Sequence, residues 1–218
     1  MCSFSCVRWG QGWHIPAIAH HPDAQLVAIV DANPHPQSTL NKLESLESLS
    51  TKYNTPIYAS VNEMLQQVGN DLDGVIISTS HFSHYGIAQA IYTYSDSNNT
   101  GPIHILMEKP MTTEIDHAHK ICQLVMDKHH KEHHTAQLRI NHSANYRSQA
   151  MTAKHHMHRI GRLRHITASF ASPVMFIFED PANKGWNEPS GTMLGNGACF
   201  VVILWGVSLT IYVRHIFH

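Results

Sequence analysis

Four short apolar runs recur along the first two thirds of the chain, each followed by a stretch whose apolar residues have helical spacing. A continuous apolar run is typical of a buried strand in a parallel sheet, because helices then cover both faces of the sheet. This alternation predicts an α/β fold with a parallel sheet between two layers of helices. The predicted strands are 26–30, 73–79, 103–107 and 136–140, with a short edge strand at 56–58, and the predicted helices are 13–21, 36–53, 61–68, 84–94, 113–130 and 144–160.

A carboxylate, an amine and a proline follow the apolar run 103–107 directly, as Glu108, Lys109 and Pro110. Pro110 fixes its own φ and favours an extended conformation for Lys109. The pair would therefore be presented at the carboxyl end of a buried strand, which is the edge where open α/β sheets bind ligands. The alternative interpretation is a surface salt bridge between Glu108 and Lys109.

An acidic residue, Asp31, follows the predicted strand 26–30. A carboxylate at such a strand end can accept hydrogen bonds from both hydroxyls of an adenosine ribose. The residues that come next, Ala-Asn-Pro, include no Arg or Lys to hold a 2′-phosphate, so NAD is favoured over NADP. The alternative is that Asp31 is a helix cap or a turn residue before Pro34.

The glycine-rich turn expected before the first helix is incomplete. If Gly10 is the third glycine of a Gly-x-Gly-x-x-Gly fingerprint, the first two positions fall on Ser5 and Val7. If Gly10 and Gly12 are the first two, the third position falls inside the helix. We prefer the first alignment, which leaves residues 1–4 before the turn and predicts a missing or disrupted first strand. Val7 then places a branched Cβ where backbone should approach a pyrophosphate, so cofactor binding is predicted to be impaired.

Composition limits the classes of function. The 218 residues suffice for one domain and part of a second, and 43% hydrophobic residues can form a sizeable core. A formal net charge of -1 gives no electrostatic basis for binding nucleic acid or an acidic membrane. No Cys-x-x-Cys pair occurs among Cys2, Cys6, Cys122 and Cys199, and no signal peptide is recognisable, so we expect a reducing, cytoplasmic location.

These motifs together resemble the Gfo/Idh/MocA family, the group of glucose–fructose oxidoreductase and inositol dehydrogenase. The resemblance is carried by Asp31 at a strand end, by 73–79 with His84 downstream, and by Glu108-Lys109-Pro110. It covers about residues 8–197, and further matching segments are 10–18, 145–147, 160–163 and 184–189.

The resemblance implies a Rossmann domain at 1–142, part of an α/β substrate domain at 143–218, and hydride transfer between NAD or NADP and a sugar or polyol. It implies that Lys109 is catalytic and lies beside the reacting carbon. The cofactor-binding residues that it implies are Gly10, Gly12, Trp13, His14, Asp31, Ser78, Thr79, Ser80, His84, Glu108 and Lys109. We leave homo-oligomerisation open.

The carboxyl-terminal part departs from the family pattern. Where the family often places Asp-x-Gly-x-His, this sequence has Gly195 and Cys199 at the Asp and His positions. Residues 198–213 are almost entirely apolar, but they fall short of the about 20 residues of a typical membrane span. We expect that this segment does not cross a membrane, and that the chain is truncated at both ends of the family pattern.

Three classes of function therefore remain. The first is an NAD(P)-dependent oxidoreductase. The second is a protein with the family's fold but without turnover, which acts through partner binding if at all, and Ser5, Val7, Gly195 and Cys199 favour it. The third, which we favour least, is a membrane-anchored protein. The His-x-x-Glu-His spacing at 129–133 matches some zinc proteases, but it lies at a predicted helix end among many histidines, so we predict no metal site.

Overall fold

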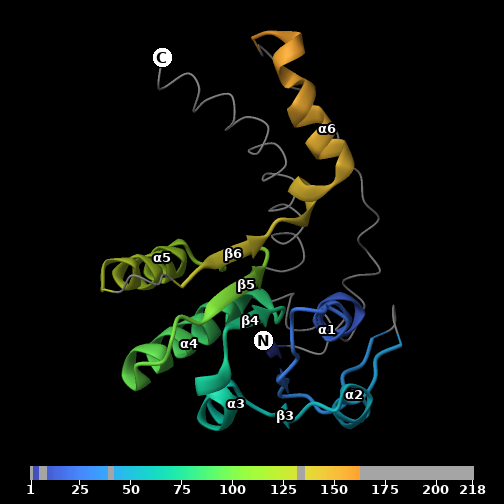
Figure 1. The fold of residues 1–218 in the computed structure, drawn as a ribbon, viewed down its shortest axis with the longest axis vertical. Coiled ribbons are helices and arrows are strands. Elements are labelled where there is room, and N and C mark those ends of the chain that lie inside the picture. The colour runs from blue at the N-terminus through green and yellow to red at the C-terminus, as the bar shows by residue number, and fades with distance from the viewer. Residues whose placement is uncertain (1, 5–8, 39–41, 132–135, 163–218) are drawn as a thin grey trace.

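The computed structural model describes residues 2–4, 9–38, 42–131 and 136–162. Within this part, six parallel strands form one sheet in the order β3-β2-β1-β4-β5-β6 (Figure 1). The strands are β1 (Cys2–Phe4), β2 (Ala28–Val30), β3 (Ile57–Tyr58), β4 (Gly74–Ile77), β5 (His104–Glu108) and β6 (Leu138–Asn141). The predicted α/β fold with a parallel sheet is confirmed.

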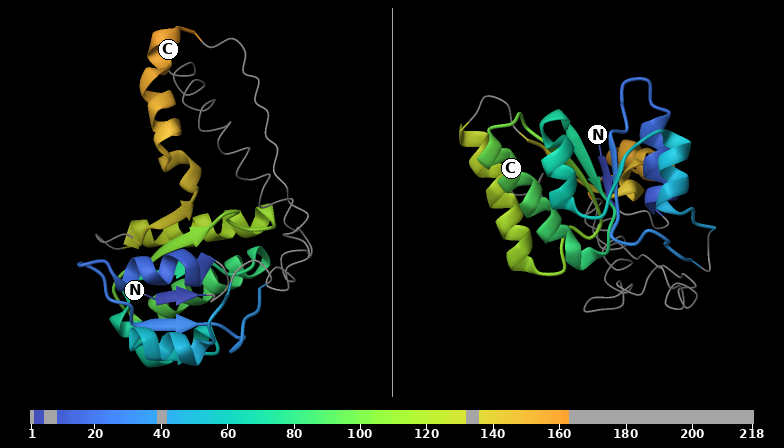
Figure 2. Two further views of the ribbon diagram at one scale, coloured as in Figure 1. Left: turned by 90° about the vertical axis from the view of Figure 1, so that its right-hand side faces the viewer. Right: turned by 90° about the horizontal axis from the view of Figure 1, so that it is seen from below.

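Helices cover both faces of the sheet. The helical segments are a π-helix at Gly10–His14, α1 (Ile15–Ala19), α2 (Leu46–Tyr53), α3 (Val61–Val68), α4 (His84–Asn98), α5 (Ile115–Lys131) and α6 (Ser148–His156), with 3-10 turns at Gly69–Asp71, His81–Ser83, Ser143–Tyr146 and Met157–Ile160. Helices α3, α4 and α5 lie on one face, and α1 and α2 lie on the other (Figure 2).

Alternation along each strand divides the core into two clusters. In β4, Val75 and Ile77 pack into the cluster under α3, α4 and α5, whereas Ile76 packs into the cluster under α1 and α2. In β5, Met107 joins the first cluster and Leu106 packs against the second. Successive side chains of a strand point to opposite faces of the sheet, so these continuous apolar runs fill both clusters.

Two serines set where helices begin. The Ser45 hydroxyl accepts a hydrogen bond from the backbone N–H of Ser48 at the start of α2, with an N–O distance of 3.2 Å. The Ser60 hydroxyl does the same for Glu63 at the start of α3, and the Glu63 carboxylate reaches back to the N–H of Ala59. Both arrangements satisfy backbone donors that have no partner inside the helix.

The prediction of a missing first strand is wrong. Residues Cys2–Phe4 form β1 in the middle of the sheet, where Cys2 pairs with Ala28 of β2 and with Val75 of β4. Three residues are enough here because a central strand is held by hydrogen bonds on both of its edges. Strand β1 precedes the turn, as the alignment with Gly10 as third glycine requires, while residues 5–8 lie outside the described residues.

Two predicted helices are shorter in the structure. Of the helix predicted at 36–53, α2 forms the part from Leu46 onward, because Ser45 caps it and because Gln11 binds the backbone N–H and C=O of Glu44. The helix predicted at 144–160 is divided into a 3-10 turn, α6 and a second 3-10 turn.

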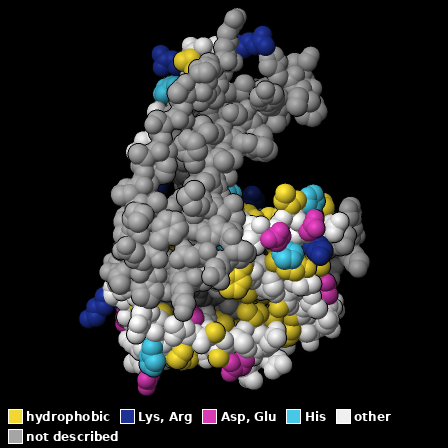
Figure 3. Space-filling model, turned by 180° about the vertical axis from the view of Figure 1, so that it is seen from behind, with side chains coloured by type: hydrophobic (Ala, Val, Ile, Leu, Met, Phe, Trp, Pro, Cys, Tyr) yellow, Lys and Arg dark blue, Asp and Glu magenta, His cyan; other side chains and the backbone are white. Residues whose placement is uncertain are grey.

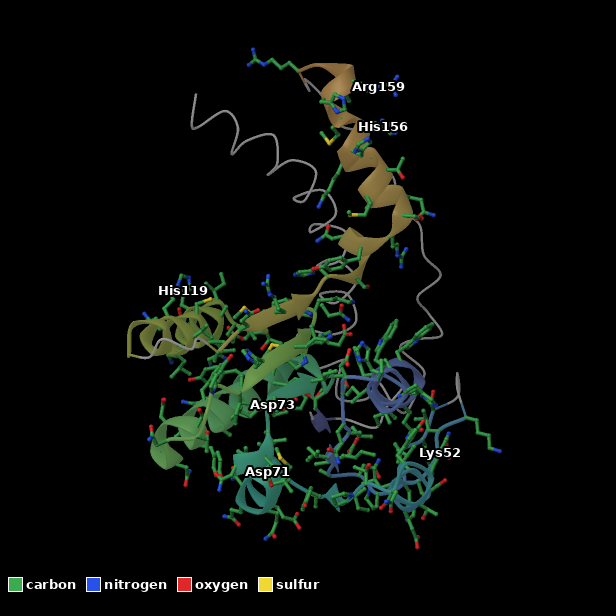
Figure 4. All side chains as sticks on the ribbon, viewed as in Figure 1. Lys52, Asp71, Asp73, His119, His156 and Arg159 are labelled. Atoms are coloured by element: carbon green, nitrogen blue, oxygen red, sulfur yellow. The ribbon has the colours of Figure 1, made fainter. Side chains whose placement is uncertain are left out.

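Helix α6 projects away from the sheet, and none of its residues is buried (Figure 1). The far end of α6 carries His156, and the 3-10 turn that follows carries Arg159 (Figure 4). Lys and Arg side chains also mark this end when the molecule is seen from behind (Figure 3). The sheet predicted for the second domain, the family's Asp-x-Gly-x-His region and the apolar segment 198–213 lie outside the described residues. In the described part, no helix has both the length and the apolar character that a membrane span requires.

Candidate active site

The carboxyl ends of β4, β5 and β6 lie side by side and bring together residues from distant parts of the chain. Ile77 pairs with Met107, and Glu108 pairs with Asn141 in the parallel register. The polar residues that end or follow these strands therefore share one edge, and they are Ser78 and Thr79, Glu108 and Lys109, and Asn141 and His142. The strand order reverses between β1 and β4, which is the point where open α/β sheets bind their ligands.

Glu108 is the best-connected carboxylate of this edge. Its Oε1 lies 2.9 Å from Nε2 of His14 and 2.6 Å from Nδ2 of Asn141, and its side chain is 13% exposed. Burial raises the pKa of the Glu108 carboxyl, but the hydrogen bonds from His14 and Asn141 and the nearby charges of His14 and Lys109 outweigh it and leave the pKa below its ordinary value. Glu108 is therefore ionised at neutral pH and accepts both hydrogen bonds.

Lys109 is half-buried, and the peptide bond that joins it to Pro110 is cis. Its positive charge acts on two nearby imidazoles. Burial lowers the pKa of His81 to about 4, with further lowering by His84 and Lys109, and burial followed by Lys109 lowers the pKa of His142. The charge of Lys109 thus helps to keep both imidazoles neutral at pH 7.

His84 is fully buried at the start of α4. Its Nδ1 lies 3.0 Å from the carbonyl oxygen of Pro110, and its Nε2 lies 3.1 Å from the carbonyl oxygen of Thr79. Ser78 is also buried, and the Ser83 hydroxyl lies 2.7 Å from Oγ1 of Thr79. His84 is thereby placed against the backbone of the site.

The residues predicted to bind the nucleotide cofactor lie at different points along the same end of the sheet. Gly10 is buried and a Cβ on Gly12 would meet open space, while Trp13 is 67% exposed and His14 points to Glu108. Asp31 follows β2, and its Oδ1 accepts a hydrogen bond from the backbone N–H of Asn33 at 2.8 Å. This is the contact expected if Asp31 is a turn residue, which was the alternative interpretation. A ribose contact by Asp31 therefore stays a prediction.

Sequence reasoning missed Asn141, His142 and His81 as members of the site. The signal for Asn141 was present, because it directly follows the predicted strand 136–140, just as Glu108 directly follows the predicted strand 103–107. His81 could have been suspected from its place between the strand end and His84, but its burial depends on tertiary packing.

An NAD(P) cofactor is implied by the resemblance, and the described residues fit its binding. The sheet has the 3-2-1-4-5-6 order of dinucleotide-binding folds, Asp31 lies at the end of β2, and Ser78 and Thr79 follow β4. The segment that would approach the pyrophosphate, residues 5–8, lies outside the described residues. Among the described side chains, no group of three or more His, Cys, Asp or Glu residues could hold a metal ion.

Comparison with known proteins agrees with this arrangement. The model of the oxidoreductase family with an NAD-binding Rossmann fold, GFO_IDH_MocA, matches residues 9–135, which is more than half of the chain. A search of curated proteins finds no significant match.

Solved structures share the fold at low sequence identity. The WlbA dehydrogenase from Chromobacterium violaceum, in complex with NADH and UDP-GlcNAcA, has 22% identity and a TM-score of 0.58 over 74% of this chain and 40% of that chain. A myo-inositol dehydrogenase from Lactobacillus casei, in complex with NAD(H) and myo-inositol, has 16% identity and a TM-score of 0.57, with 74% and 41% covered. A 3-ketoreductase from Actinomadura kijaniata, in complex with NADP and TDP-benzene, has 14% identity and a TM-score of 0.57, with 72% and 41% covered. This chain spans about two fifths of the length of these proteins.

Proposed function

The chain belongs to the oxidoreductase family with an NAD-binding Rossmann fold, and from this premise we propose that it is an NAD(P)-dependent dehydrogenase for a sugar or polyol. The observation that supports this best is the pair formed by an ionised, doubly hydrogen-bonded Glu108 and the adjacent Lys109 at the carboxyl edge of β5. The substrate class is taken from the structural neighbours, which bind a nucleotide sugar or inositol.

The protein's own residues would hold the cofactor and handle charge at the reacting oxygen. Asp31 would hold the adenosine ribose, and Ser78 and Thr79 would line the cofactor's path across the sheet edge. A bound nicotinamide would supply the hydride acceptor or donor. Lys109 would place a positive charge beside the oxygen of the hydroxyl or carbonyl that reacts, and its ammonium could pass a proton. The carboxylate of Glu108 would provide a fixed negative charge next to that lysine.

We further propose that NAD is preferred over NADP, because no Arg or Lys follows Asp31 in the next three residues. Isothermal titration of the full chain with NADH and NADPH tests this, and tighter binding of NADPH would contradict it. Val7 would weaken the binding of either cofactor, so Val7→Gly should tighten NADH binding. Val27→Gly, in a different segment, is the control for loss of a valine side chain. An unchanged affinity in Val7→Gly would remove the basis for impaired binding.

Lys109→Ala tests the catalytic assignment. We expect turnover to fall by about a hundredfold or more, the range for loss of one acid–base or oxyanion group. The dissociation constant for NADH should change little, because the ribose and pyrophosphate contacts lie elsewhere. Lys52→Ala is a matched control, because Lys52 lies on the outside of α2 (Figure 4), where it pairs with Glu44 at 2.7 Å.

The measurement is the steady-state rate of the wild type and both variants across a panel of sugars and polyols. If Lys109 merely formed a surface pair, its removal would leave the rate near normal and would change stability by less than about 1 kcal/mol. A wild type that binds NADH but turns over no member of the panel would favour the family fold without turnover, acting through a partner. Cytoplasmic location and homo-oligomerisation stay predictions, which cell fractionation and light scattering would test.

A further inference from the structure

His84 joins two segments that follow neighbouring strands. Its ring is fully buried, and its two nitrogens lie 3.0 Å from the carbonyl oxygen of Pro110 and 3.1 Å from that of Thr79. Thr79 comes shortly after β4, and Pro110 directly follows Lys109. A single imidazole therefore spans from the end of β4 to the turn that carries the proposed catalytic lysine.

Both ring nitrogens face hydrogen-bond acceptors, but a neutral imidazole has one N–H. Burial lowers the pKa of His84, against the opposing effects of its backbone contacts, chiefly those with Thr79 and Pro110, and of the charge on Glu108. The ring is thus neutral at pH 7 and donates to one of its two carbonyls. The Pro110 contact is the more deeply buried, and an unmet carbonyl is more costly where water cannot reach it. We therefore expect the ring proton on Nδ1.

We propose that His84 is a positioning residue for Lys109, in which the Nδ1–H of His84 donates to the carbonyl of Pro110 and fixes the Pro110–Met111 peptide unit, one residue beyond the lysine. The proposal rests on the catalytic role proposed above for Lys109, and it requires no contact between His84 and cofactor or substrate. Fixing this turn matters because a displacement of about 1 Å in a catalytic group can lower a rate by about a hundredfold.

The first experiment locates the ring proton in the wild-type chain. Nitrogen-15 NMR of the histidine side chains at pH 7, with His84 assigned by its absence in a His84 variant, distinguishes a protonated from an unprotonated ring nitrogen. We expect the Nδ1–H form. A proton on Nε2 would overturn the proposal, because an unprotonated Nδ1 cannot donate to Pro110.

The second experiment separates the two carbonyl contacts with a pair of variants. In His84→Asn the amide nitrogen is as many bonds from Cβ as Nδ1 is, so it can keep the Pro110 contact. In His84→Gln the amide nitrogen corresponds to Nε2, so it can keep the Thr79 contact. The environment of Lys109 is read from the carbon-13 resonance of its reductively methylated amine, assigned by its loss in Lys109→Arg.

We expect the Lys109 resonance to keep its wild-type position in His84→Asn and to shift or broaden in His84→Gln. The turnover number should follow the same order, with a loss of about tenfold or more in His84→Gln and little change in KM. Equal effects of the two variants, or the reverse order, would overturn the proposal, as a residue that merely fills space would give no such order. If both variants fail to fold, the position of the ring proton in the wild-type chain, from the first experiment, decides whether the proposal holds.

The two experiments on His84 test its positioning role independently of the proposed function. If Lys109→Ala leaves turnover unchanged, the catalytic role of Lys109 falls, whereas the tautomer and the Lys109 resonance still report whether His84 fixes the turn.

Discussion

The burial of His81 predicts a dependence of stability on pH that one substitution should remove. His81 is 2% exposed, and burial, followed by the charges of His84 and Lys109, lowers its pKa from 6.5 to about 4. The unfolded chain takes up a proton at this residue as the pH falls through about 6.5, whereas the folded chain takes it up near pH 4. The free energy of unfolding therefore falls between these pH values, and the contribution of neutral His81 is fully present above pH 7.

The size of the effect follows from the shift in pKa. One unit corresponds to about 1.4 kcal/mol, so the whole shift is worth about 3 kcal/mol at most. Between pH 7 and pH 5, proton linkage at this one residue lowers the free energy of unfolding by about 2 kcal/mol. Burial also lowers the pKa values of His84 and His142, so the wild type should lose more than this in the same interval.

Urea unfolding at pH 7, 6 and 5 of the wild type and of His81→Asn measures the difference. The variant has no titrating group at this position, so its loss of stability between pH 7 and pH 5 should be smaller than that of the wild type by about 2 kcal/mol. Its absolute stability at pH 7 does not enter this comparison. His35→Asn, which replaces an exposed imidazole, is the matched control. Equal losses in His81→Asn and the wild type would refute the reasoning.

Two further predictions concern single hydrogen bonds. Ser60→Ala removes the side-chain cap of α3 and should lower the free energy of unfolding by about 1 kcal/mol in urea, and a change below about 0.3 kcal/mol would contradict the role of the cap. Asn141→Ala removes one donor to Glu108 and should raise the pKa of that carboxyl in a carbon-13 NMR titration. Since the lowered pKa of Glu108 contributes stability above about pH 4.5 and loses it as pH falls, Asn141→Ala should destabilise the chain more at pH 7 than at pH 3.

The parts of the fold that the sequence predicts best are those whose signal is local. Strands β4 and β5 read as apolar runs because helices cover both faces of the sheet, and their positions were predicted to within about two residues. Strand β1 was missed because its three residues carry no pattern of their own. They are recognisable as a strand through pairing with β2 and β4, which is a property of the assembled sheet.

The same distinction applies to the site. Glu108 and Lys109 could be predicted because a charged pair directly after an apolar run is visible in one stretch of sequence. The contacts of Glu108 could not be predicted, because His14 and Asn141 come from segments 94 and 33 residues away. Asn141 reaches Glu108 through the parallel register of β5 and β6, and His14 reaches it from the π-helix at Gly10–His14. The burial of His81 and His84 likewise depends on packing against elements distant in the sequence.

The alternation of side chains along β5 explains how Glu108 comes to lie beside the first helix. Leu106 packs toward α1 and α2, and Glu108, two residues later, reaches His14 on that same face. Met107, between them, packs toward α3, α4 and α5 on the opposite face, and the strand ends at Glu108. The positive charge of Lys109 lowers the pKa of Glu108 and also the pKa values of His81 and His142. The carboxylate at the end of β5 is thus held beside the first helix by His14, while the positive charge of Lys109, in the bend that follows the strand, acts on Glu108 and on the imidazoles of His81 and His142.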